Sequence, residues 1–172
     1  QVFLAGLKAA LEADSTFAGG RYIVPPARGL RAFARVYAGW AYSQAFFRRG
    51  AWRELGHASC AALLADWERE HLAWDANDLL AMLWSWQHAD IARAGGFATL
   101  AAALAAIPAR VIAMPCATDL YFPPADNALE VAALPAGELR VIDSDWGHVA
   151  GGPDREPRAT ARIEQAIRDL LD

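Results

Sequence analysis

Cysteine is scarce in this chain of 172 residues, which contains only Cys60 and Cys116. Two cysteines are too few for the disulfide framework of small secreted domains, so we expect a reducing, cytoplasmic setting. The chain also lacks any run of about 18 apolar residues, and we expect neither a membrane-spanning helix nor a membrane partner. The net charge of −4 lacks the positive excess of nucleic-acid-binding proteins, so we expect no nucleic-acid partner.

Hydrophobic residues are abundant, at 55% of the chain, and this excludes an intrinsically disordered protein. A chain of this length can bury a substantial core. Gln1 occupies the first position, with no charged-then-apolar leader after it. We therefore expect the chain to begin inside a longer gene product.

The pattern divides the chain near residue 107 into two unlike parts, 1–106 and 107–172. The first part is predicted to be helical, and Phe3, Leu7 and Leu11 form one apolar face near its start. Further helices are predicted at residues 29–48, 54–70, 75–93 and 97–106.

The second part is predicted to alternate strands and helices. Buried strands are expected at residues 110–115 and 139–143, and helices at 125–134 and 158–171. Ile163, Ile167 and either Leu170 or Leu171 are expected to face inward from the last helix. This order is typical of a parallel α/β sheet, but two strands cannot complete one, so we expect them to form the edge of something larger.

Two residues that could support catalysis follow the two predicted strands. Asp119 and His148 each lie just beyond a strand end, and the carboxyl ends of parallel strands share one edge of the sheet. A carboxylate that orients an imidazole is what a hydroxyl nucleophile needs in order to lose its proton. Taken singly, an aspartate in a loop is more often a turn residue, and the joint placement of the pair carries the prediction.

The nucleophile of such a site is missing from the sequence. None of the serines lies in a Gly-x-Ser-x-Gly turn, and Cys116, the alternative nucleophile, lacks the equivalent turn. A metal site is not expected, because His57, His71 and His88 lack ligand partners at helical spacing. We therefore expect the nucleophile in a missing N-terminal half, before Gln1.

Several segments resemble the homoserine O-acetyltransferase family of α/β-hydrolase-fold enzymes. They cover residues 1–14, 19–22, 29–35, 74–80, 118–124 and 147–148. The last two match the family's acid and histidine motifs. The resemblance implies the C-terminal half of an α/β-hydrolase fold, with residues 1–106 as a helical lid and 107–172 as the last two core strands and their helices. It also implies a homodimer formed through the lid helices.

The resemblance implies ping-pong acyl transfer with no bound cofactor. An upstream serine would take an acyl group from acetyl-CoA or another acyl-CoA cosubstrate and pass it to an alcohol. His148 would be the general base and then the general acid, and Asp119 would hold its tautomer.

Two departures from the family pattern concern the substrate. Ser43 stands where the family has a carboxylate-binding arginine, and Val149 stands where an aspartate follows the histidine. In the family, the arginine binds the carboxylate of the amino acid and the aspartate meets its amino group. The loss of both charges argues against a zwitterionic acceptor such as homoserine. Ser43, Val149 and the neighbouring Trp146 are the candidate substrate contacts, for a less polar alcohol or ester.

Two alternatives to acyl transfer stay open. The same Ser-His-Asp set would serve an esterase, in which water takes the acyl group. A non-catalytic helical fragment is the other alternative, because the chain lacks a nucleophile.

Overall fold

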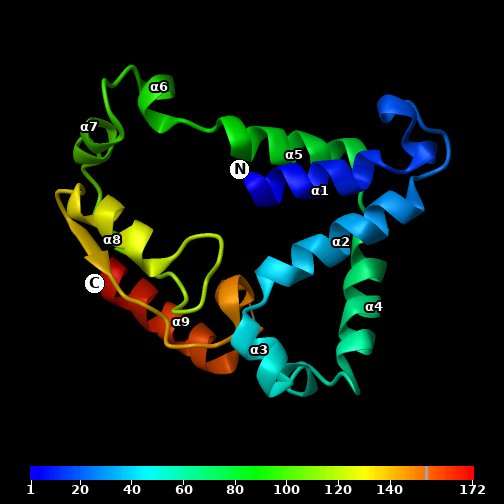
Figure 1. Ribbon diagram of the computed structural model, residues 1–172. Helices are drawn as coiled ribbons and strands as arrows, with labels where there is room; N and C mark the ends of the chain where they lie inside the picture. The colour runs from blue at the N-terminus through cyan, green and yellow to red at the C-terminus, as the bar shows by residue number, and fades with distance from the viewer. Residues whose placement is uncertain (154) are drawn as a thin grey trace. The chain divides into compact units, whose positions relative to one another are not determined.

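The computed structural model describes residues 1–153 and 155–172 (Figure 1). These residues divide into two compact units. The first unit comprises Gln1–Gly39 and Trp52–Ala89, and the second comprises Trp40–Ala51 and Asp90–Asp172. These units differ from the predicted division at residue 107. That division separates a lid from a catalytic core by function, and it stays a prediction.

The first unit is helical. Its elements are α1 (Val2–Glu12), the 3-10 helix η1 (Ser15–Gly20), most of α2 (Ala27–Ala41), α4 (Cys60–His71) and α5 (Ala76–His88). Helix α1 lies alongside α5 (Figure 1). No helix in the described part of the chain combines the length and the apolar character needed to cross a bilayer.

The buried face of α1 differs from the predicted one at one position. Leu4, Leu7 and Leu11 are buried, whereas the side chain of Phe3 is 52% exposed. Leu4 replaces Phe3 because positions 4, 7 and 11 follow the i, i+3, i+7 stripe of a helix with 3.6 residues per turn.

Capping side chains divide the predicted helices into shorter ones. The predicted helix 29–48 ends at Ala41, and α3 (Gln44–Arg49) starts anew because the hydroxyl of Ser43 accepts a hydrogen bond from the Phe46 amide. Asp90 likewise starts α6 (Ile91–Gly95) as a separate helix, and Ser59 delays the start of α4 to Cys60. Thr99 starts α7 (Leu100–Ala105) in the same way.

The sheet in the second unit is parallel, as predicted, and has two strands in the described residues. β1 (Val111–Ala113) pairs with β2 (Gly137–Leu139), and α8 (Pro124–Ala132) connects them. The first strand is shorter than the predicted 110–115, and the second begins and ends earlier than the predicted 139–143. The Arg140 amide donates to the Ala113 carbonyl at 2.9 Å, but the residue placed to donate to the Arg140 carbonyl is Pro115, which has no amide hydrogen.

Pairing resumes beyond this interruption. Ile142 donates to the Pro115 carbonyl and accepts from the Ala117 amide, both at 2.9 Å. This isolated bridge between Cys116 and Ile142 carries the parallel alignment up to the loops that follow.

The last helix, α9 (Pro157–Leu171), packs on β1 through small residues. Ala159 and Ala166 are its buried side chains, whereas Ile167, Leu170 and Leu171 are 51%, 41% and 81% exposed. The predicted inward face is therefore wrong at these positions, because alanine permits the closer approach. Both strands are half-buried rather than fully buried.

A buried carboxylate joins α2 to α4 in the first unit. Glu68 on α4 is 5% exposed and accepts hydrogen bonds from Arg31, at 3.2 Å, and from Arg35. The bond from Arg35 is the main cause that lowers the pKa of Glu68 below its ordinary value of 4.5, against the effect of burial.

We predict that Glu68→Gln lowers the free energy of unfolding at pH 7 by about 1–2 kcal/mol, since two charge-assisted bonds are weakened. Because the folded-state pKa is lowered, this contribution is complete above pH 4.5 and disappears as the pH falls and the carboxyl protonates. Urea unfolding at several pH values measures the difference. Glu70→Gln, at an exposed position of the same helix, is the control, and an equal effect there would contradict the prediction.

Candidate active site

The loops after the two strands lie side by side. The bridge between Cys116 and Ile142 holds the chain after β1 beside the chain after β2. Asp119 follows the first of these positions by three residues, and His148 follows the second by six. The structure thus brings together the two residues that the sequence predicts as a catalytic pair.

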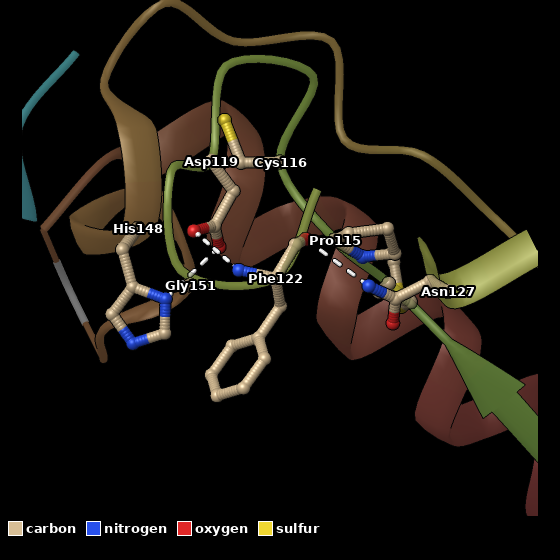
Figure 2. Close-up of a pocket in the computed structure, with 8 residues that line it drawn as sticks. Pro115, Cys116, Asp119, Phe122, Asn127, His148 and Gly151 are labelled. Atoms are coloured by element: carbon tan, nitrogen blue, oxygen red, sulfur yellow. Dashed lines mark hydrogen bonds and ion pairs between the residues drawn. The ribbon is translucent and has the colours of Figure 1, made fainter. Parts of the chain in front are cut away.

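Asp119 and His148 are hydrogen-bonded to each other. The distance from His148 Nδ1 to Asp119 Oδ2 is 2.9 Å, and the Asp119 side chain is 6% exposed (Figure 2). The other carboxylate oxygen, Oδ1, accepts from the backbone amides of Tyr121 at 2.7 Å and Phe122 at 3.1 Å. These bonds fix the carboxylate in one orientation toward the imidazole.

The charge of Asp119 is stabilised despite its burial. Burial raises the pKa of the carboxyl, but hydrogen bonds from His148 and from the Tyr121 and Phe122 amides outweigh this and lower the pKa below 3.8. An ionised Asp119 favours the imidazole tautomer that carries its proton on Nδ1, and in that tautomer Nε2 is the basic nitrogen. In the described chain Nε2 has no hydrogen-bond partner.

Aromatic side chains pack against the imidazole of His148. The Tyr121 ring stacks on His148 with centroids 4.1 Å apart and planes inclined by 23°, and Phe122 lies 5.6 Å from it. Trp40 contacts Tyr121 with a centroid distance of 4.0 Å. The sequence alone did not indicate these roles, although Tyr121 and Phe122 follow Asp119 directly.

A cavity of about 220 Å³ lies beside the pair (Figure 2). Its lining residues are Met114, Pro115, Cys116, Asp119, Phe122, Asn127, His148 and Gly151. The amide group of Asn127 donates to the carbonyls of Phe122 and Pro123, which braces the loop after Asp119.

The Cys116 thiol is not placed as a free nucleophile. The residue is 3% exposed, and its sulfur donates to the Ser144 carbonyl at 3.2 Å. Thr118 binds the same carbonyl at 3.1 Å, and its hydroxyl accepts from the Gly147 amide at 3.1 Å. Both side chains therefore tie the loop of Asp119 to the loop of His148.

None of the three predicted substrate contacts lines this cavity. The buried Ser43 hydroxyl donates to the Asp145 carbonyl and accepts from the Phe46 amide, so it has no proton left for a ligand. Trp146 is buried against Phe46, with centroids 5.5 Å apart, and Val149 is half-buried. Their role as substrate contacts stays a prediction.

Among residues 1–153 and 155–172, no three His, Cys, Asp or Glu side chains are placed to share a metal ion. His71 is buried among aromatic rings in the first unit, and burial lowers its pKa.

Comparisons with known proteins point to esterases. No protein-family model matches the chain. The chain is 39% identical to the probable esterase Cgl0839 of Corynebacterium glutamicum, over 99% of this chain and 49% of that protein. It is 33% identical to an ethyl acetate hydrolase of Pseudomonas veronii, over 81% of this chain and 41% of that protein.

Solved structures show the same fold. An acetylester hydrolase from Corynebacterium glutamicum matches with a TM-score of 0.93 and 36% identity, over 99% of this chain and 49% of that one. A homoserine O-acetyltransferase from Bacillus anthracis matches with a TM-score of 0.77, over 98% of this chain and 48% of that one. At 22% identity, the second likeness concerns the fold alone.

The chain spans about half the length of the curated relatives it matches. It has the fold of the C-terminal part of an α/β-hydrolase, as the sequence predicts. The expected membership of the homoserine O-acetyltransferase family is supported only at the level of this superfamily, because the relatives with higher identity are esterases.

The backbone at Gly147 requires glycine for two reasons. Its φ is +74°, and a Cβ at this position would lie 2.7 Å from the Ser43 nitrogen and 2.9 Å from the Ala41 oxygen. We predict that Gly147→Ala lowers the free energy of unfolding by about 1–3 kcal/mol, as measured by urea unfolding. Gly151→Ala is the control, because a Cβ there meets nothing within 4 Å, and equal losses would refute this account.

Proposed function

We propose that this chain is the C-terminal half of a serine esterase that hydrolyses small carboxylic esters, with acetate esters as the preferred substrates. The observation that carries the proposal is the hydrogen-bonded pair of Asp119 and His148, with Nε2 of His148 unpartnered in the described chain beside a small cavity. The names of the relatives, an ethyl acetate hydrolase among them, support hydrolysis over the acyl transfer that the sequence resemblance implies.

In the proposed reaction, a serine hydroxyl from the other half of the fold attacks the ester carbonyl. Nε2 of His148 takes the hydroxyl proton as the C–O bond forms, and it gives this proton to the alcohol that leaves as the acyl-enzyme forms. Water then loses a proton to His148 and attacks the acyl-enzyme, and the proton returns to the serine as the carboxylic acid departs.

Asp119 acts through His148. Its carboxylate holds the Nδ1 proton, so the tautomer with a basic Nε2 is favoured, and it stabilises the imidazolium that forms at each step. Burial strengthens this interaction, since little water screens the carboxylate. The stacked Tyr121 ring restricts rotation of the imidazole out of this position.

The apolar surroundings of the pair support a weakly polar substrate. Phe122, Met114 and Pro115 supply apolar walls to a cavity of about 220 Å³. Neither Ser43 nor Val149 offers a charge to a zwitterionic amino acid, and a buried unpaired ammonium group would be costly. Acyl-CoA as a donor, with an alcohol as the acceptor, is the competing outcome that experiment must test.

We predict that His148→Ala and Asp119→Asn each lower kcat for acetate-ester hydrolysis by the full-length protein, by about 10³-fold or more. The first change removes the base, and the second removes the acceptor that fixes its tautomer. Steady-state kinetics with 4-nitrophenyl acetate measure both effects. His88→Ala and Asp143→Asn, at exposed positions, are matched controls that keep the wild-type kcat, and full activity in His148→Ala would rule out the proposal.

Hydrolysis and transfer are separated by offering the same acyl-enzyme two acceptors. We expect acetate release from ethyl acetate and from 4-nitrophenyl acetate at rates that added alcohols, homoserine included, change little. Product analysis by chromatography measures the partition between acetate and the new ester. Dominant ester formation, or CoA release from acetyl-CoA only when an alcohol is present, would instead establish an acyltransferase.

A further inference from the structure

The loop that carries His148 is held by α3, a short helix far from it in the sequence. Arg49, near the end of α3, forms a two-pronged ion pair with Asp145: Nε lies 2.6 Å from Oδ2, and Nη2 lies 2.8 Å from Oδ1. Asp145 precedes His148 by only three residues. The two charged residues are 96 positions apart in the chain, so the contact exists only in the folded protein.

Other contacts between the same two segments act in the same direction. The Ser43 hydroxyl donates to the Asp145 carbonyl, and Trp146 packs edge-on against Phe46 of α3. Gly147 lies against the backbone just before α3, too closely for any side chain. The three residues that precede His148 are thus each held by the segment Trp40–Ala51.

The other side of the loop is anchored to Asp119. Thr118 accepts from the Gly147 amide and donates to the Ser144 carbonyl, at 3.1 Å in both cases. The position of His148 relative to Asp119 therefore depends on two sets of contacts, one from the loop of Asp119 and one from α3.

We propose that Arg49 and Asp145 are positioning residues, which hold the loop so that the His148 imidazole keeps its hydrogen bond to Asp119. This proposal rests on the proposed function, in which His148 is the base. Neither residue lines the cavity beside His148, so the proposed action is through the loop that carries His148. The bidentate geometry matters because two parallel bonds fix a direction as well as a distance.

The energetics separate this role from simple stabilisation. The side chains of Arg49 and Asp145 are 46% and 32% exposed, and ion pairs of such exposure contribute little to folding. Hydrogen bonding from Arg49 is the main cause of the lowered pKa of Asp145, so the pair stays charged at neutral pH. A catalytic base, in contrast, loses much of its efficiency when it is displaced by a fraction of an ångström.

The test is a double-mutant cycle in the full-length protein, made of Arg49→Leu, Asp145→Asn and the double variant. We expect each single variant to lower kcat for 4-nitrophenyl acetate about tenfold, with KM changed less than about twofold. The double variant should lose no more than either single one, because the two residues act as a pair. Arg49→Lys should recover part of kcat, since it keeps the charge and loses the second prong.

Two further measurements separate positioning from folding. The melting temperature should stay near that of the wild type in all variants, and the low-field proton resonance of the bond between His148 and Asp119 should weaken in Arg49→Leu. Added salt should lower kcat of the wild type toward that of Arg49→Leu and leave the variant unchanged, because ions screen an exposed pair. Arg48→Leu, its exposed neighbour, is the matched control and should behave as the wild type.

Several outcomes would overturn the proposal. They are an unchanged kcat and resonance in Arg49→Leu, multiplied losses in the double variant, equal losses in Arg48→Leu, or losses of kcat that follow the melting temperature. If the wild type hydrolyses no ester, the proposed function fails, while the resonance still decides whether Arg49 positions His148.

Discussion

The hydrogen bond between Asp119 and His148 sets the requirements that the second unit must meet. A carboxylate that is 6% exposed loses most of its hydration, which is costly unless protein donors replace the water. The tight turn after Asp119 supplies two donors locally, the amides of Tyr121 and Phe122. The imidazole of His148 is a further donor, and it comes from a different loop. Much of the fold of this unit places the loop of His148 beside the loop of Asp119.

The two strands bring the loops of Asp119 and His148 together. The parallel register of β1 and β2 resumes after Pro115 and ends at the pair of Cys116 and Ile142, so the two following loops start side by side. Thr118 then bonds to both Ser144 and Gly147 and joins the loops a second time. Gly147 permits a backbone approach that any side chain would prevent. Backbone geometry and the Thr118 hydroxyl thus place the loop of His148, and the stacked Tyr121 ring fixes the orientation of the imidazole.

Ser43 is a candidate substrate contact by its sequence position, and in the structure it has a structural role. Where the resemblance implies a substrate-binding arginine, the structure has a helix cap whose hydroxyl also holds the Asp145 carbonyl. At the opposite end of α3, the guanidinium of Arg49 pairs with the carboxylate of Asp145. Ser43 and α3 therefore help to hold the loop that carries His148. The weakly polar cavity agrees with the esterase names of the relatives.

The sequence by itself determined the two strand positions approximately, the parallel α/β order, and the pairing of Asp119 with His148, since these follow from local hydrophobic runs and from the rule that strand ends share an edge. It misplaced the inward face of α9 and joined α2 to α3, because a buried alanine and a capping serine carry little hydrophobic signal. Only the tertiary structure decided what holds the histidine loop. The ion pair of Arg49 with Asp145 and the approach of Gly147 to Ser43 join segments about a hundred residues apart, and no local periodicity encodes such contacts.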